Sequence, residues 1–147
     1  MKHILVVVFL FFGRIELMNA QNSPPPSVSD SSNNIIFTKV DVEAAFPGGE
    51  AGWRKYLMQN LEIDKIAKKI KIPRGEKELR VTIIVKFVVA WNGTISDVAA
   101  ENIDADPKCI AEAIRVINIS PKWVPAKQNG RSVNAYRRQP ITFLFER

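Results

Sequence analysis

Three glycines stand just before two basic residues in the stretch AFPGGEAGWRKYL, residues 45–57, and this combination can bind phosphate. Phosphate-binding loops use glycine so that backbone N–H groups approach the anion, with a lysine beside them. The nucleotide-binding pattern G-x-x-x-x-G-K-[ST] does not fit, because Gly48 and Gly52 have the wrong spacing and Trp53 follows. The dinucleotide pattern G-x-G-x-x-G does not fit either. We therefore predict a turn that leads into a helix.

The chain has one cysteine, Cys109, and one histidine, His3. A serine or cysteine nucleophile needs a base such as histidine beside it, and His3 lies in a segment that we expect to be removed on export. Cys109 lies near a helix start, which can lower the pKa of a thiol. We predict instead that it is a small core residue beside Ile110.

Four acidic residues gather between positions 97 and 106, and carboxylates of this kind can bind calcium or hydrolyse glycans: Asp97, Glu101, Asp104 and Asp106. Their spacing lacks the glycine and the closing glutamate of an EF-hand loop. We expect them to cap a helix and to line a solvated loop, with no metal and no cofactor. An envelope enzyme that acts on glycan or peptidoglycan through Asp97 or Glu101 is an alternative of another class.

The first twenty residues differ in character from the rest of the chain. Met1–His3 is positive, and Ile4–Phe12 is an unbroken run of nine apolar residues. A bilayer-spanning helix needs about 20 apolar residues, whereas a signal peptide needs about half as many. We predict a signal peptide over 1–20, cleaved after Ala20, and hence a periplasmic protein without a membrane span. The alternative is an uncleaved N-terminus that anchors the chain in the inner membrane.

Residues 21–34, QNSPPPSVSDSSNN, have the composition of a linker, since proline stiffens the segment and its polar residues bury nothing. The predicted domain covers 35–147. The chain has a formal net charge of +6. Because we expect it to leave the cytoplasm, this charge indicates a solvated surface or an anionic envelope partner, and no nucleic acid.

Apolar periodicity predicts the elements of the domain. One helical stripe consists of Trp53, Tyr56, Leu57 and Leu61, and a second stripe covers 63–70. Strict alternation from Leu79 to Trp91 predicts the strongest strand. The pair Asn92-Gly93 predicts a two-residue hairpin turn into a return strand.

Residues 104–120 predict a further helix, with Asp106 as its N-cap and Pro107 in its first turn. Its expected buried stripe is Ile110, Ala113, Ile114 and Ile117. The last element covers 133–146, where Pro140 favours an edge strand or a bulge because proline lacks a backbone donor. The order predicts a two-layer α+β fold, in which helices cover one face of a small antiparallel sheet of about three strands.

Three stretches together resemble the TonB C-terminal domain as it occurs in Bacteroidetes-type bacteria. They are FPGGEAGWRKYLMQNL, VTIIVKFVVAWNGTISDVAAENI and CIAEAIRVINISPKWVPAKQNGRSVNAYRRQPITFLF, which lie in the family's order between about residues 40 and 146. The resemblance implies a small α+β domain in the periplasm. It also implies that the domain grips a short extended peptide, the TonB box, on the plug of an outer-membrane receptor.

In that family the peptide adds a strand to the edge of the sheet. By the resemblance we expect the docking edge to be the last strand, with these binding residues: Val133, Ala135, Arg137, Gln139, Ile141, Thr142, Phe143 and Phe145. The partner is a receptor plug or another envelope protein, and exposed edges can also pair two copies into a homodimer. Family members carry a Tyr-Pro pair before the first long strand, whereas this chain has Ile72-Pro73.

Overall fold

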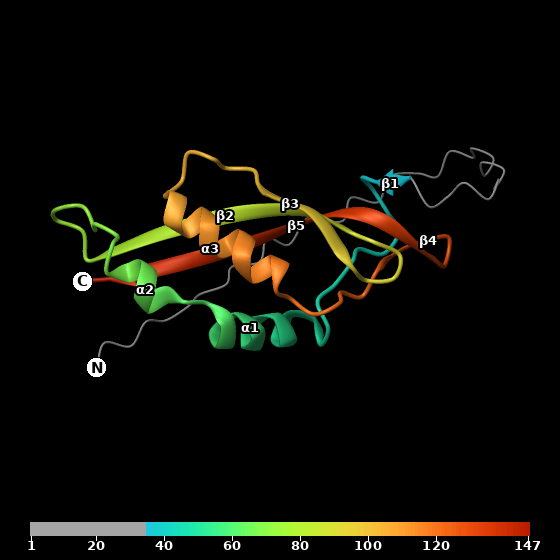
Figure 1. Cartoon of the computed structure of the whole chain (residues 1–147), viewed down its shortest axis with the longest axis horizontal. Helices are drawn as coiled ribbons and strands as arrows, with labels where there is room; N and C mark the ends of the chain where they lie inside the picture. The colour runs from blue at the N-terminus through green and yellow to red at the C-terminus, as the bar shows by residue number, and fades with distance from the viewer. Residues whose placement is uncertain (1–34) are drawn as a thin grey trace, which may run out of the picture.

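The structure is a computed structural model that describes residues 35–147. The predicted signal peptide and linker lie outside these residues. The described chain forms three helices and five strands (Figure 1). The helices are α1 (Gly49–Asn60), α2 (Ile63–Ala67) and α3 (Pro107–Asn118). The strands are β1 (Ile36–Phe37), β2 (Glu78–Val89), β3 (Ile95–Ala100), β4 (Ala126–Gln128) and β5 (Arg131–Glu146).

The sheet has the order β1-β5-β2-β3, and β4 pairs with β5 as a short hairpin. The prediction of about three strands is therefore too low for the described residues. The two further strands, β1 and β4, are only two and three residues long, which leaves too little alternation for sequence analysis to detect. Both lie at the end of the sheet that is remote from α2 and from the C-terminus (Figure 1).

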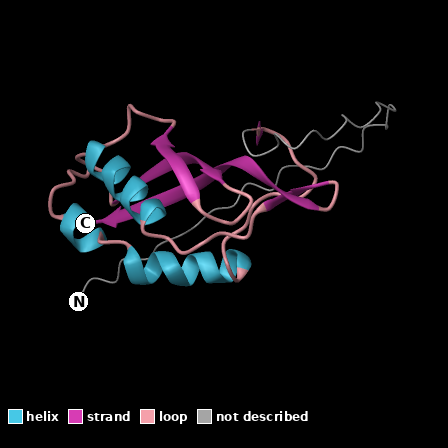
Figure 2. Cartoon of the chain, turned by 45° about the vertical axis from the view of Figure 1, so that its right-hand side comes forward, coloured by secondary structure: helices cyan, strands magenta, loops and turns pink. Residues whose placement is uncertain are grey.

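Strand β2 alternates as predicted up to Phe87, whereas residues 87–89 and 141–145 are buried without alternation. One face of the sheet packs on the helices (Figure 2). Ile83, Val85 and Phe87 of β2 are completely buried in one core with residues from α1 and α3. Burial of each such side chain stabilises the fold by about 1.5–3 kcal/mol. Trp123 closes this core from the connection before β4 and packs against Phe87 at 5.0 Å between ring centroids.

The glycine-rich stretch makes the turn and helix start that the sequence predicts. Gly48 is the N-cap of α1 and has φ 77°, a left-handed conformation that suits glycine. Gly52 lies against the chain before the helix, where a Cβ would meet the Pro47 carbonyl oxygen at 2.2 Å. The third glycine thus allows close packing between the turn and the helix.

The tip between β2 and β3 differs from the predicted two-residue turn. The Ala90 N–H donates to the Thr94 carbonyl at 2.8 Å, so the loop holds three residues, Trp91–Gly93. Trp91 therefore lies in the loop with 54% of its surface exposed and does not continue the inward face of β2. Gly93 supplies the positive φ of 84° that closes the loop.

Helix α3 starts as predicted, since the Asp106 carboxylate accepts a hydrogen bond from the Lys108 N–H at 2.8 Å. Its buried stripe is shifted from the predicted one. The buried residues are Cys109, Glu112, Ala113, Val116 and Ile117, whereas Ile110 and Ile114 are only partly buried. The shift arises because the buried Glu112 carboxylate accepts hydrogen bonds from the Glu62 N–H and the Arg115 guanidinium. The predicted stripe did not include this charged residue.

Candidate peptide-binding edge

Strand β5 is paired unequally on its two sides. On one side it pairs with β2 over the whole length from Ala135 to Glu146, in unbroken antiparallel register. On the other side, β1 pairs only with Asn134 and Ala135, whereas the short hairpin strand β4 pairs with residues 131–133 on the side that faces β2. No strand among residues 35–147 pairs with this second side from Tyr136 to Glu146. We call this side, over residues 136–146, the open edge.

The hydrogen bonds of Ile84 show which backbone groups of β5 lie on the open edge. The Ile84 N–H donates to the Asn102 side chain at 2.8 Å, and the Ile84 carbonyl accepts from the Glu101 N–H at 2.9 Å. Both groups therefore point toward β3 and away from β5. Hence Ile84 and its partner Pro140 form a non-hydrogen-bonded pair, and the Pro140 nitrogen points to the open edge.

Backbone N–H and C=O groups point to alternate sides along a strand. Those of the even-numbered residues of β5 therefore point to the open edge, as the Pro140 nitrogen does. The outward N–H groups belong to Tyr136, Arg138, Thr142, Leu144 and Glu146. The odd-numbered residues point to β2, and the Arg147 N–H continues this pattern by donating to the Lys77 carbonyl at 3.0 Å. The missing donor of Pro140 is thus a gap in the open edge, and the unbroken register shows that Pro140 causes no bulge.

The eight predicted binding residues divide into two kinds. Thr142 has its backbone N–H and C=O on the open edge, as derived above. The other seven are odd-numbered, so their backbone groups point to β2 or β4 and their side chains to the helix-covered face: Val133, Ala135, Arg137, Gln139, Ile141, Phe143 and Phe145. Sequence analysis missed the outward residues Tyr136, Arg138 and Leu144. Pro140 was a usable signal, because proline is tolerated in a strand where its nitrogen faces outward.

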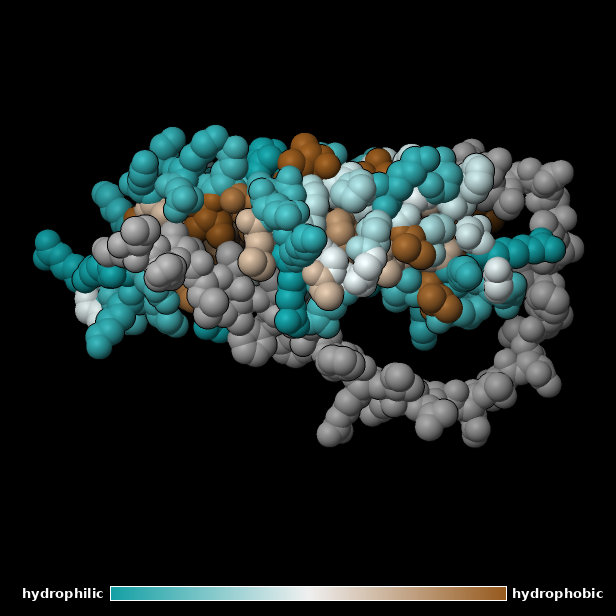
Figure 3. Space-filling model, turned by 90° about the horizontal axis from the view of Figure 1, so that it is seen from below, coloured by the Kyte–Doolittle hydropathy of each residue, from teal (hydrophilic) through white to brown (hydrophobic). Residues whose placement is uncertain are grey.

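Accessibility varies along the open edge. Arg138 is exposed and Tyr136 and Pro140 are partly exposed, whereas Thr142 is 4% exposed and Leu144 is 3% exposed. The first residues of the open edge are therefore its most accessible part. On the face seen from below in Figure 3, apolar residues form small patches separated by hydrophilic ones.

Three other residues considered for chemistry are held in structural contacts or in the core. The Glu101 carboxylate accepts a hydrogen bond from the Arg138 guanidinium at 2.9 Å, and the Asp97 carboxylate accepts one from the Ser96 hydroxyl at 3.1 Å. Cys109 is fully buried, and burial raises the pKa of its thiol to about 11, with a smaller contribution from the Asp106 charge. The prediction of a core cysteine is confirmed, and a thiolate nucleophile is not favoured.

Among the described residues, no group of acidic, histidine or cysteine side chains is arranged to hold a metal ion. None of the helices between residues 35 and 147 is long and apolar enough to cross a bilayer. The Ile72-Pro73 pair lies beside the end of β5, where both carbonyl oxygens accept hydrogen bonds from the Arg147 guanidinium.

Comparison with known families gives one match. The family described as Gram-negative bacterial TonB protein C-terminal matches residues 76–145, which hold β2, β3, α3, β4 and nearly all of β5. The resemblance stated from the sequence is thus confirmed for this segment, while α1 and the glycine-rich turn lie outside it. The chain matches no curated protein and no solved structure.

Proposed function

Residues 76–145 belong to the TonB C-terminal domain family, and from this premise we propose that the protein binds outer-membrane receptors by strand addition. The receptor contributes a short extended segment, the TonB box, which pairs with the open edge of β5. The domain thereby takes part in energy-dependent transport across the outer membrane. It acts as a protein-binding module and not as an enzyme.

One observation carries the proposal, namely the unequal pairing of β5. Its β2 side is fully paired, while no described strand satisfies the outward N–H and C=O groups between Tyr136 and Glu146. An added strand supplies those hydrogen bonds, and main-chain pairing provides affinity with little demand on side chains. Thr142 remains in the proposed binding set, and the outward set of Tyr136, Arg138 and Leu144 joins it.

An NMR titration of the purified protein with TonB-box peptides from the same organism tests the proposal. Peptide binding should slow hydrogen exchange at the outward amides of Arg138, Thr142 and Leu144. The inward amides of Ile141 and Phe143 serve as the matched control, because they already donate to β2. Equal protection at both sets, or protection centred on β3, contradicts strand addition at β5. A folded protein that binds no box peptide means that the fold serves another envelope partner.

The periplasmic location is also part of the proposal, and it depends on export through residues 1–20. Mass spectrometry of the protein from cell envelopes tests it, because cleavage after Ala20 gives a mature chain that starts at Gln21. An intact N-terminus favours the alternative, an energy transducer anchored in the inner membrane. Size measurements on the same sample test whether open edges pair two copies into a homodimer.

A further inference from the structure

A cavity lies where the open edge begins. It has a volume of about 390 Å³ and is lined by Thr38, Glu43, Lys86, Tyr136, Arg137 and Arg138. Strand β1 pairs with β5 up to Ala135 and ends at Phe37, and Thr38 and Glu43 of the segment that follows line the cavity together with Tyr136. The cavity therefore lies beside the most accessible part of the open edge. A strand that pairs with β5 from Tyr136 onward has one end at this cavity.

Arg137 lacks adequate partners in the cavity wall. Its Nε is buried and has no hydrogen-bond acceptor among the described residues. Its Nη1 lies 3.8 Å from the Glu43 carboxylate, beyond hydrogen-bond distance, and its Nη2 reaches the Gln139 side chain only at 3.5 Å. Burial lowers the pKa of Arg137, and the Glu43 charge offsets this only in part. The side chain is thus partly removed from water, with 26% of its surface exposed, and no partner fully compensates for the lost hydration.

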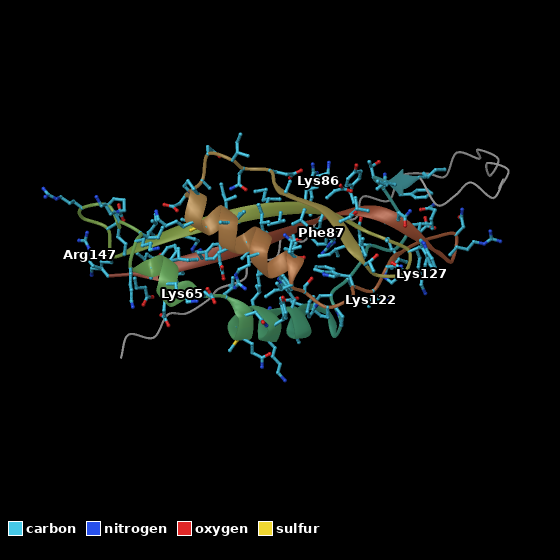
Figure 4. The ribbon with its side chains drawn as sticks, in the orientation of Figure 1. Lys65, Lys86, Phe87, Lys122, Lys127 and Arg147 are labelled. Carbon is cyan, nitrogen blue, oxygen red and sulfur yellow. The ribbon has the colours of Figure 1, made fainter. Side chains whose placement is uncertain are left out.

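The other lining charges make the cavity cationic. Lys86 and Phe87 point to opposite sides of β2 (Figure 4), and the Lys86 ammonium lies 4.2 Å from the centre of the Tyr136 ring. Its side chain therefore extends across the sheet toward β5. Arg138 pairs with Glu101, which comes from β3's C-terminal flank and does not line the cavity. The lining thus holds three cations and one carboxylate, Glu43; Lys86 and Arg138 reach it from one face of the sheet and Arg137 from the helix-covered face.

From these observations we infer that the strand bound at β5 carries an acidic side chain, which enters this cavity and binds the Arg137 guanidinium. The inference rests on the proposed function. A carboxylate suits the site because a guanidinium presents parallel N–H donors that match its two oxygens. Lys86 and Arg138 add attraction from the rim. The acidic residue lies at the end of the strand that pairs next to Tyr136, so it fixes the register of a pairing that is otherwise made by backbone groups.

The first experiment tests the cavity with acetate alone, followed at the arginine Nε–Hε NMR signals. Acetate should shift the Arg137 signal in a saturable way. Arg115 is the internal control, because its Nε already donates to the Glu112 carboxylate at 2.7 Å. Equal shifts at both arginines, or no shift at Arg137, overturn the inference, whether or not a peptide pairs with β5.

The second experiment compares peptides that differ in one residue. A TonB-box peptide with glutamate at its first or last position should bind about tenfold more tightly than the glutamine version. High salt should reduce this difference in affinity between the two peptides, because it screens the charges. Arg137→Met should abolish this difference in affinity without loss of stability, because the variant removes a partly buried and poorly compensated cation. Arg131→Met, at the exposed start of β5, is the matched control and should leave the difference unchanged.

The outcomes separate the inference from the proposed function. Peptides that protect the outward amides equally well with glutamate and glutamine overturn the inference and leave strand addition intact. A selective acetate shift at Arg137 without any peptide pairing at β5 overturns both, since the acidic group then comes from another ligand. Selective acetate binding together with the glutamate preference supports both.

Discussion

The two outer edges of this sheet differ in how far they can accept another strand. Strand β3 forms one edge over six residues, Ile95–Ala100. The open edge of β5 runs from Tyr136 to Glu146, which is nearly twice as long. Unpaired edges invite pairing with other chains, and proteins shorten or distort the edges that they do not use. The difference indicates that β5 is the edge available for a partner.

The β3 edge is distorted by an extra residue. Lys86 pairs with Ala99 but Val88 pairs with Ser96, so two residues of β3, Asp97 and Val98, stand opposite Phe87 alone. Asp97 lies at this bulge with φ 53°, a left-handed conformation. A bulge twists a strand and breaks the regular row of donors and acceptors. An added strand therefore meets an irregular edge at β3 and a regular one at β5.

The largest expected effect concerns the helix behind the β3 edge. Helix α3 packs on β2 and β3, and its buried Cys109 has a pKa raised from 9.0 to about 11. The folded state therefore keeps the thiol proton more strongly than the unfolded state. The protonated thiol therefore contributes fully to the free energy of unfolding below pH 9, and this contribution is lost as the pH rises toward 11. The free energy of unfolding should fall by about 1.4 kcal/mol at pH 10 and about 2 kcal/mol at pH 11.

Urea unfolding at pH 8 and pH 10 measures this loss, and Cys109→Ala is the reference because it removes the thiol. At pH 8 the variant should be less stable than the unchanged protein. Between pH 8 and pH 10, however, its free energy of unfolding should fall by less. Hydrogen exchange at pH 10 also shows whether β3 opens before β5. Identical pH dependence in both proteins contradicts the prediction.

The next effect concerns the donors of the open edge. Thr142→Pro should weaken binding of a TonB-box peptide about tenfold or more, because it removes an outward N–H and places a ring where the partner strand approaches. The inward ladder to β2 should persist, since Pro140 already occupies an equivalent position. Isothermal titration calorimetry measures the affinity.

Two controls sharpen this comparison. Thr142→Val keeps the N–H but removes the hydroxyl that hydrogen-bonds Thr82 at 2.9 Å, so it should bind the peptide normally. Ala100→Pro removes a donor from the β3 edge, because Ala100 forms a non-hydrogen-bonded pair with Val85 and faces outward. It should also bind normally if it is folded. Weakened binding by Ala100→Pro alone makes β3 the docking edge.

A smaller effect tests whether Asp97 fixes the bulge in β3. Asp97→Val should lower the free energy of unfolding by about 1 kcal/mol, because a β-branched residue disfavours a positive φ. Asp97→Gly should not be destabilising, since glycine adopts this conformation freely. Thermal unfolding of both variants measures the difference. Equal stability of the two variants contradicts a strained bulge and weakens the contrast between the edges.

The elements with strong periodicity were predictable from the sequence, because each has one apolar face. Trp53 and Leu57 mark α1, the alternation of Ile83, Val85 and Phe87 marks β2, and Asp106 marks the start of α3. Core packing agrees with local pattern at these positions, so local signals suffice.

The remaining features depend on contacts between distant segments. The shifted stripe of α3 depends on Glu112, whose burial becomes favourable only when the Glu62 N–H and Arg115 are nearby. The bulge at Asp97 depends on pairing with β2, and no glycine marks it. The outward direction of Thr142 follows from a register that Ile84 and Asn102 define. Local sequence patterns do not identify partners that lie far apart in the sequence, so these features could not be predicted.

The smallest expected effect concerns the gap at Pro140. Pro140→Val adds an outward N–H and leaves the β2 ladder unchanged, because Pro140 and Ile84 form a non-hydrogen-bonded pair. One added hydrogen bond should tighten peptide binding about threefold, and the continuous edge should increase self-association in sedimentation experiments. The double variant Pro140→Val with Thr142→Pro moves the gap by two residues and is the control. If the number of outward donors sets the affinity, the double variant should bind close to the unchanged protein. If it binds as poorly as Thr142→Pro alone, the position of the gap matters and the partner strand pairs mainly near Thr142.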